Sequence, residues 1–167
     1  LLRKAVASDP KLRVLILEDR ENDALLMLRE LRRAGFDTVW KRVASRQSFL
    51  AAIQQEVWDI ILADYSLPQY SGLEALAAAR DLIPDIPFVI VSGAIGEETA
   101  VATMKAGADD FVLKQSLSRL GPVVERELRD ASVQRARRQA EQKLKERDAL
   151  FRSVIENVSD LIFILDR

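Results

Sequence analysis

Five short apolar runs constrain the fold of this chain more than any other feature of its sequence. Runs such as VLILED (residues 14–19) and FVIVSG (88–93) are apolar on both faces instead of alternating between apolar and polar residues. This pattern is typical of strands in a parallel sheet that helices cover on both sides. The predicted strands are residues 12–19, 37–43, 58–64, 87–93 and 110–114.

Segments with the helical spacing of apolar residues lie between these runs. The first contains Ala24, Leu28 and Leu31 and ends at Gly35, a residue type that often terminates helices. Strand and helix therefore alternate along the chain, which predicts an α/β fold with a doubly wound five-stranded parallel sheet. Of the two common strand orders, the flavodoxin-like order 2-1-3-4-5 suits five strands best, and it places the first and third strands side by side.

Composition excludes several kinds of chemistry. The 167 residues include no cysteine and no histidine, which excludes disulfides, thiol nucleophiles, imidazole bases and the usual zinc ligands. Any metal must therefore be a hard cation bound by oxygen. The net charge of -1 indicates no nucleic-acid or membrane partner, and no apolar run is long enough for a membrane span. We expect a cytoplasmic location.

Carboxylates stand where the first and third predicted strands end. Glu18 and Asp19 end the first strand, and Asp64 ends the third, just before the loop that contains Pro68 and Gly72. Ligands of open α/β sheets bind beyond the carboxyl ends of the strands, where the strand order reverses. We therefore expect these three carboxylates to converge, and unpaired anions at such short range favour a bound divalent cation, here Mg²⁺.

Two further strand ends add a hydroxyl and an ammonium group to the same edge. Ser92 ends the fourth strand and Lys114 the fifth. Singly, such residues are usually turn formers or solvated side chains. Together they match phosphoryl transfer, in which a protein positions the nucleophile and neutralises phosphoryl charge. Asp64 would form an aspartyl phosphate, Glu18 and Asp19 would hold Mg²⁺ together with the Ser66 carbonyl, and Ser92 and Lys114 would contact phosphoryl oxygens.

These motifs resemble the receiver domain of two-component response regulators. The resemblance covers about residues 12–125 and rests on Glu18-Asp19, "ADYSLPQYSG", "VIVSGAIG" and "GADDFVLK". It implies Asp64 as phosphoacceptor, Mg²⁺ as cofactor, and the phosphohistidine of a histidine kinase or phosphotransfer protein as donor. It also implies a switch in which Ser92 and Phe111 move, although Phe111 could equally be a core residue. Gln115 follows Lys114 where the family often has proline, so a trans peptide is expected there.

A different composition follows Pro122. Residues 123–150 are rich in charged residues and lack glycine and proline, which predicts one long helix. A heptad through Leu117, Leu120, Val124 and Ala131 fades and resumes in another phase through Ala140, Leu144, Phe151 and Val154. This indicates a weak coiled coil and a homodimer, with a solvated single helix as the alternative. The stretch "LFRSVIENVSDLIFILDR" is similar to the start of a PAS domain, with a turn expected at Ser159-Asp160 and then a strand.

The sequence thus predicts four segments: an N-terminal tail (1–11), a receiver domain (12–121), a helical linker (122–149) and a truncated PAS-like start (150–167). We expect a phosphoacceptor module of a multidomain signalling protein, and not an enzyme beyond its own phosphorylation and dephosphorylation. One alternative is a dimerisation module with a vestigial pocket. Another is an aspartate-dependent phosphohydrolase, which would want a second Asp where Ser66 stands.

Overall fold

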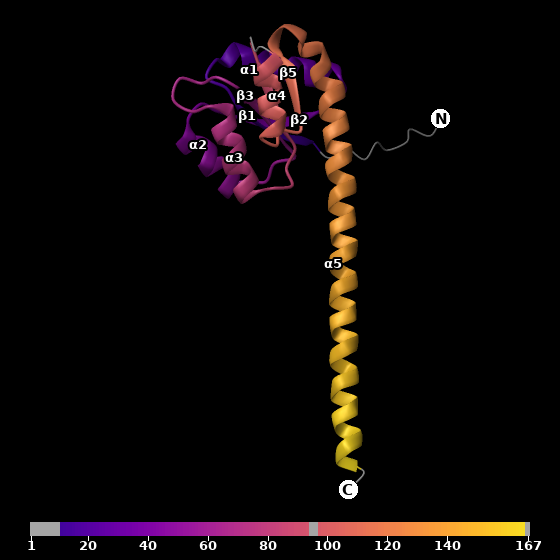
Figure 1. Cartoon of the computed structure of the whole chain (residues 1–167). Coiled ribbons are helices and arrows are strands. Elements are labelled where there is room, and N and C mark those ends of the chain that lie inside the picture. The colour runs from indigo at the N-terminus through magenta and orange to yellow at the C-terminus, as the bar shows by residue number, and fades with distance from the viewer. Residues whose placement is uncertain (1–10, 94–96, 166–167) are drawn as a thin grey trace, which may run out of the picture. The chain divides into compact units, whose positions relative to one another are not determined.

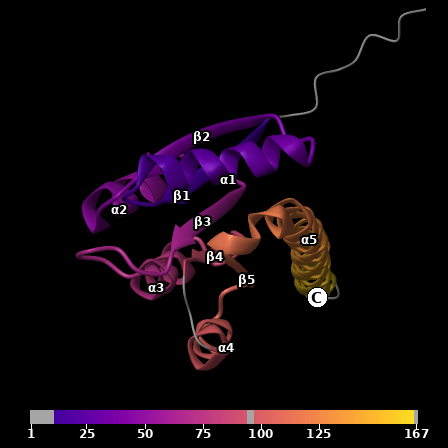
Figure 2. The same ribbon diagram turned by 90° about the horizontal axis from the view of Figure 1, so that it is seen from above.

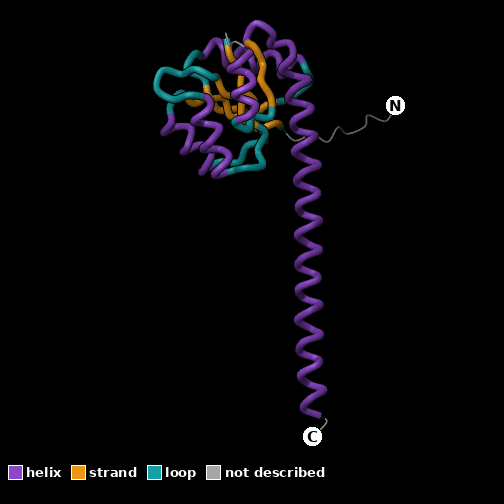
Figure 3. Tube along the Cα trace, viewed as in Figure 1, coloured by secondary structure: helices purple, strands orange, loops and turns teal. Residues whose placement is uncertain are grey.

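A computed structural model describes the backbone of residues 11–93 and 97–165, and the side chains of residues 11–93 and 100–152. Strands and helices alternate as expected (Figures 1 and 3). The elements are β1 (Leu12–Leu17), α1 (Glu21–Arg33), β2 (Thr38–Val43), α2 (Arg46–Gln55), β3 (Ile60–Asp64), α3 (Gly72–Leu82), β4 (Phe88–Ser92), α4 (Glu97–Lys105), β5 (Asp110–Leu113), η1 (Lys114–Arg119) and α5 (Leu120–Leu165).

All strands of the sheet are parallel, and their order is β2-β1-β3-β4-β5. This confirms the doubly wound, flavodoxin-like sheet and the long C-terminal helix. The order places β1 directly beside β3, with Leu17 opposite Ala63. The chain therefore leaves β1 and β3 at the same edge of the sheet, and Glu18 and Asp64 lie at that edge.

Helices cover both faces of the sheet, as Figure 2 shows. Helix α1 and the first turns of α5 pack on one face, where Met27 and Leu31 of α1 and Leu120 and Val124 of α5 are buried together with Val14. Helices α2 and α3 pack on the other face through a second set of buried residues: Phe49, Ala52, Ile53, Ala75, Leu76 and Ala79. Each large apolar side chain buried in this way contributes roughly 1.5–3 kcal/mol to stability.

The helix on each side of β3 begins at a serine cap. Ser45 accepts from the backbone N–H of Ser48 at the start of α2, and Ser71 accepts from that of Glu74 at the start of α3. The Glu74 carboxylate in turn accepts from the backbone N–H of Ser71 at 2.8 Å, which completes a capping box. Each cap contributes about 1 kcal/mol and fixes where the loops at the site edge of the sheet end.

The start of α5 packs closely against α1. A Cβ added to Gly121 would lie 2.4 Å from the Cβ of Ala34, so only glycine allows this approach. Pro122 stands in the first helical turn, where its missing N–H leaves no hydrogen bond unmade. Leu120 and Val124 are fully buried in the domain core, so they are unavailable as seam positions of a coiled coil. The heptad predicted through these two residues was therefore wrong, because their apolar pattern serves the core.

Helix α5 is continuous to Leu165, where the sequence had predicted a turn at Ser159-Asp160 followed by a strand. A helix makes its backbone hydrogen bonds within itself, whereas a strand needs a neighbouring strand. Among the described residues, the last strand is β5, which ends at Leu113. The chain divides into two compact units, residues Leu1–Ala131 and Ser132–Arg167. In the described part of the chain, we find no helix whose length and apolar content would suit a membrane span.

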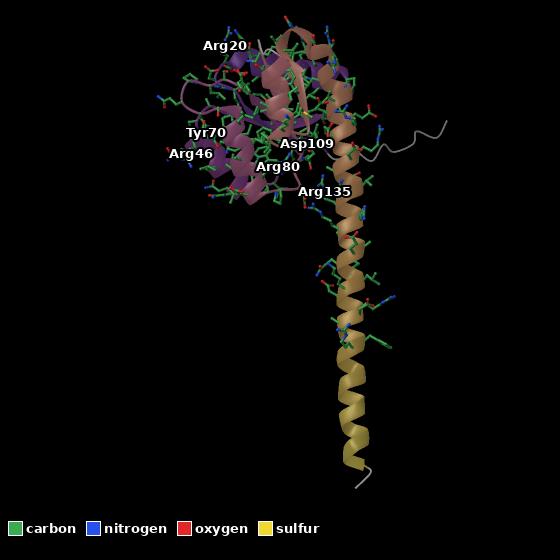
Figure 4. All side chains as sticks on the ribbon, viewed as in Figure 1. Arg20, Arg46, Tyr70, Arg80, Asp109 and Arg135 are labelled. Atoms are coloured by element: carbon green, nitrogen blue, oxygen red, sulfur yellow. The ribbon has the colours of Figure 1, made fainter. Side chains whose placement is uncertain are left out.

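The opposite end of the sheet from the carboxylates is held by Arg80 of α3, which Figure 4 labels together with Asp109. The Arg80 guanidinium donates to the carbonyls of Gly107 (2.9 Å), Pro84 (3.2 Å) and Ile86 (2.8 Å). It also pairs with Asp109 at 2.6 Å. Asp109 accepts from the Phe88 backbone N–H at 2.7 Å, so this network joins α3 to the start of β4 and the segment before β5.

Candidate functional site

Three carboxylates converge at the edge where β1 and β3 end. Glu18, Asp19 and Asp64 each offer an oxygen atom, and these atoms lie within 4.8 Å of one another. Glu18 is fully buried and Asp64 is 7% exposed, whereas Asp19 faces solvent. The cluster therefore has a buried side and an open side. A hollow of about 350 Å³ adjoins Asp19 and is lined by Ala44, Ser45, Arg46, Gln47, Pro68 and Gln69.

Lys114, directly after β5, brings its ammonium group into the same cluster. Its Nζ lies 2.6 Å from Glu18 Oε2, 2.8 Å from Asp64 Oδ2 and 2.7 Å from Asp23 Oδ2. An ammonium group has three N–H donors, and each of these carboxylates is in position to accept one. Only 18% of the lysine side chain is exposed, so these pairs are much less screened than surface ion pairs.

The buried side of the cluster changes proton affinities. Burial raises the pKa of Glu18 to about 6, even though hydrogen bonds from Lys114 and from the Arg20 backbone N–H lower it. Burial by itself would lower the pKa of Lys114, but hydrogen bonds to Asp23, Asp64 and Glu18 together raise it. The lysine therefore stays charged, and Glu18 is the carboxylate whose ionisation is costly.

The loop after β3 aims the Asp64 side chain. Asp64 Oδ1 accepts from the Ser66 backbone N–H at 3.3 Å, while Oδ2 faces Lys114. The loop then turns back, and the Gly72 N–H donates to the Tyr65 carbonyl at 3.0 Å. A Cβ on Gly72 would lie 2.6 Å from the Asp64 carbonyl oxygen, so glycine is required where α3 begins beside the strand end. This explains why a strand ending in a carboxylate is followed closely by glycine.

Sequence reasoning missed two residues of the site. Asp23 lies in the first turn of α1 and pairs with Lys114. Arg42 lies in β2, and its Nη1 donates to the carbonyl oxygens of Glu18 (3.0 Å) and Asp19 (3.2 Å). For Asp23, an available signal was its place one helical turn after the first strand end. An arginine on an edge strand gives no such signal, because most are solvated.

The two predicted switch residues lie outside the ion pairs of this cluster. Ser92 ends β4 at the same edge and is 3% exposed. Phe111 is half-buried in β5 and packs against the core on the α2 and α3 face. It also lines an open hollow of about 550 Å³ with Val101 and Met104 of α4. Among the described residues every peptide bond is trans, as expected for the bond from Lys114 to Gln115.

Comparison with known proteins agrees with this geometry. The family model of the response regulator receiver domain matches residues 14–124. The chain belongs to this family. The match begins in β1 and ends in the first turns of α5, so it includes the strand ends that carry Glu18, Asp64, Ser92 and Lys114.

Relatives of this receiver domain include bacterial regulators. It is 31% identical over 120 residues to the cell cycle transcriptional regulator CtrA of Caulobacter vibrioides, covering 69% of this chain and 51% of CtrA. It is 29% identical over 104 residues to the transcriptional regulatory protein ZraR of Salmonella typhimurium, covering 62% of this chain and 23% of ZraR. The chain thus spans about half or less of the length of these relatives.

Solved structures show the same fold. NtrX from Brucella abortus superposes with a TM-score of 0.70 at 27% identity, covering 78% of this chain and 30% of NtrX. The signal receiver domain of a putative Luxo repressor from Vibrio parahaemolyticus superposes with a TM-score of 0.68 at 23% identity, covering 76% of this chain and 97% of that domain.

The donor set of this receiver domain fits a hard divalent cation. Glu18, Asp19 and Asp64 supply oxygen atoms only, and these are close enough together to share one ion. Mg²⁺ prefers a few carboxylates and keeps several waters. The exposed side of the cluster at Asp19 leaves room for waters, and the buried carboxylates supply the charge.

Proposed function

We propose that this receiver domain accepts a phosphoryl group on Asp64 from the phosphohistidine of a histidine kinase or phosphotransfer protein. The observation that carries the proposal is the setting of the Asp64 carboxylate. One oxygen is held by the Ser66 backbone N–H at 3.3 Å, and the other lies 2.8 Å from the Lys114 ammonium. A nucleophile fixed beside a permanent cation is suited to attack an anionic phosphoryl group.

In the transfer, an oxygen of Asp64 attacks phosphorus, a P–O bond forms and the P–N bond of the phosphohistidine breaks. The imidazole nitrogen leaves with the electron pair of that bond and takes up a proton. The phosphoryl oxygens carry negative charge throughout, and Lys114 and the Ser92 hydroxyl would each contact one of them. The product is an aspartyl phosphate, formed once per domain, so the domain is an acceptor and not a turnover enzyme.

Glu18, Asp19 and Asp64 would hold Mg²⁺, together with the Ser66 carbonyl. When bound, the ion supplies positive charge that offsets the carboxylates and the incoming phosphoryl group. The fully buried Glu18 benefits most, because its ionisation is penalised by burial. The proposal predicts that metal binding and Glu18 ionisation are coupled.

The phosphorylated state would be relayed to α5 and beyond. Ser92 and Phe111 are the proposed switch: Ser92 would move toward the phosphoryl group, and the half-buried ring of Phe111, which borders the hollow beside α4, would turn inward to fill the space. The second unit of the chain carries exposed apolar side chains on α5, among them Leu144 (51% exposed) and Phe151 (67% exposed). These are seven residues apart, which supports a homodimeric coiled coil there. The proposal also includes the domain order of a cytoplasmic signalling protein, in which a receiver domain is followed by a helical linker and the start of a PAS-like domain.

Intact mass after incubation of the whole chain with Mg²⁺ and acetyl phosphate tests the acceptor role. We expect the mass of one phosphoryl group to be added, and to be lost after treatment with hydroxylamine, which cleaves acyl phosphates. Asp64→Asn should abolish the gain. Asp81→Asn is the matched control, because Asp81 is an exposed carboxylate at the far end of α3.

Two results would contradict the proposal. Rapid release of free phosphate over many turnovers would show a phosphohydrolase instead, because a receiver domain loses its phosphoryl group only by slow self-dephosphorylation. No mass gain from acetyl phosphate, or from any phosphorylated kinase tried in its place, would show a vestigial pocket in a dimerisation module.

A further inference from the structure

Arg42 makes a contact with the site that its position does not suggest. It stands on β2, an edge strand of the sheet, and is half-buried. Its Nη1 donates to the carbonyl oxygen of Glu18 at 3.0 Å and to that of Asp19 at 3.2 Å. We propose that Arg42 is a positioning residue that sets the Mg²⁺ affinity of the site by fixing the backbone that carries these two carboxylates. This inference rests on the proposed function, because it concerns the same cation.

Besides the contacts of Arg42, two hydrogen bonds hold the backbone at this point. The Glu18 N–H donates to the Val43 carbonyl at 2.9 Å, which is the last backbone–backbone hydrogen bond between this segment and β2. Helix α1 begins at Glu21, and its N-cap residue Arg20 makes no side-chain cap hydrogen bond. The Arg20 N–H donates instead to the Glu18 carboxylate at 3.1 Å, so this carboxylate and Arg42 together hold the two peptide groups that follow Glu18 and Asp19.

One guanidinium nitrogen with two carbonyl acceptors constrains the orientation of both peptide groups. Both oxygens must point toward β2 and lie close to each other, since they share the same donor atom. Peptide planes are rigid, so fixing the carbonyls of Glu18 and Asp19 also fixes the direction in which their side chains leave the backbone. Those side chains then approach Asp64 within the 4.8 Å cluster.

A purely electrostatic role of Arg42 and a positioning role predict opposite changes in Mg²⁺ affinity. A guanidinium stays charged at every relevant pH, and a cation near a metal site repels the metal. If Arg42 acted only through its charge, its removal would strengthen Mg²⁺ binding. If it acts by holding the backbone, its removal weakens Mg²⁺ binding. The sign of the change decides between the two.

Calorimetric titration of the full chain with MgCl₂ provides the measurement. Removal of residues that orient metal ligands typically weakens metal binding by about 10- to 100-fold, and we expect Arg42→Ala to raise the Kd for Mg²⁺ by at least roughly tenfold. Arg42→Lys retains the charge but not the planar fork, and should recover only part of the loss. The matched control is Lys41→Ala on the same strand as Arg42, which removes a 2.6 Å ion pair with Glu56 at the end of α2 and should leave the Kd unchanged.

Two further readouts separate positioning from a loss of folding. Urea unfolding in EDTA should show that Arg42→Lys and Arg42→Gln remain folded. At saturating Mg²⁺, phosphorylation of these variants by acetyl phosphate should return to the wild-type rate, because the reacting groups are intact. Equal or tighter Mg²⁺ binding by Arg42→Ala, beside a wild-type chain that binds, would overturn this inference alone. A wild-type chain that takes up no Mg²⁺ would overturn the proposed function and this inference with it.

Discussion

The buried carboxylate of Glu18 should make the stability of the metal-free domain depend on pH. Its folded pKa is raised from 4.5 to about 6 by burial, so the folded protein holds this proton more tightly than the unfolded chain does. The stabilising contribution is therefore complete below about pH 4.5 and is lost as the pH rises through about 6. At about 1.4 kcal/mol per pH unit, the loss amounts to about 2 kcal/mol.

Glu18→Gln isolates this contribution, because glutamine has a similar shape and does not titrate. The free energy of unfolding would be measured by urea denaturation in EDTA at about pH 4.5 and about pH 7.5, for wild type and variant. Other groups titrate in both proteins, so the informative quantity is the difference between them. We expect wild type to lose about 2 kcal/mol relative to Glu18→Gln over this interval. A constant offset from the lost charge of Glu18 beside Lys114 does not affect this comparison.

Mg²⁺ provides the control. Added at about pH 7.5, where Glu18 is ionised, it should restore wild-type stability and have a smaller effect on Glu18→Gln, which has lost one of the proposed ligand oxygens. The reasoning would be refuted if the difference between the two proteins stayed the same at both pH values, or if wild type gained stability relative to the variant as the pH rose.

Three more predictions follow from contacts elsewhere in the chain. Asp23→Asn removes one of the three carboxylates around Lys114, and should slow phosphorylation by acetyl phosphate at saturating Mg²⁺; an unchanged rate would show that Asp23 is dispensable. Gly121→Ala should lower the free energy of unfolding by roughly 1–3 kcal/mol in urea, because the new methyl group overlaps Ala34; Ala34→Gly should restore the loss, and a stabilised Gly121→Ala would contradict the packing argument. Leu144→Glu should reduce self-association in analytical ultracentrifugation, and equal sedimentation of variant and wild type would argue against the coiled coil.

The sequence predicts the main site because parallel strands end at a common edge. Once the strand order is assumed, Glu18, Asp64 and Lys114 must converge there, although 96 residues separate Glu18 from Lys114. Asp23 could not be predicted in this way, because it lies on a helix and not at a strand end. The long side chain of Lys114 reaches across to it. Arg42 could not be predicted either, because its contacts are with backbone carbonyls, and a motif of side chains contains no information about them.

The C-terminal region shows a different limit. Apolar periodicity predicts that Leu120 and Val124 face something apolar, but does not say whether it is the sheet or a second helix. Both are buried in the domain core. The short apolar run near residues 161–165 fits a strand or a helix equally well, and the structure has a helix there. The PAS-like resemblance of this segment stays a prediction.

The two ends of the sheet differ in how their charges are balanced. At the amino end, one guanidinium joins three carbonyl groups and the Asp109 carboxylate, so complementary charges are matched and the backbone is clamped. At the carboxyl end, carboxylates outnumber the one lysine among them, so an added cation or anion can redistribute the contacts. The amino end of the sheet thus has matched charges, whereas the carboxyl end keeps an excess of negative charge that an added cation would offset.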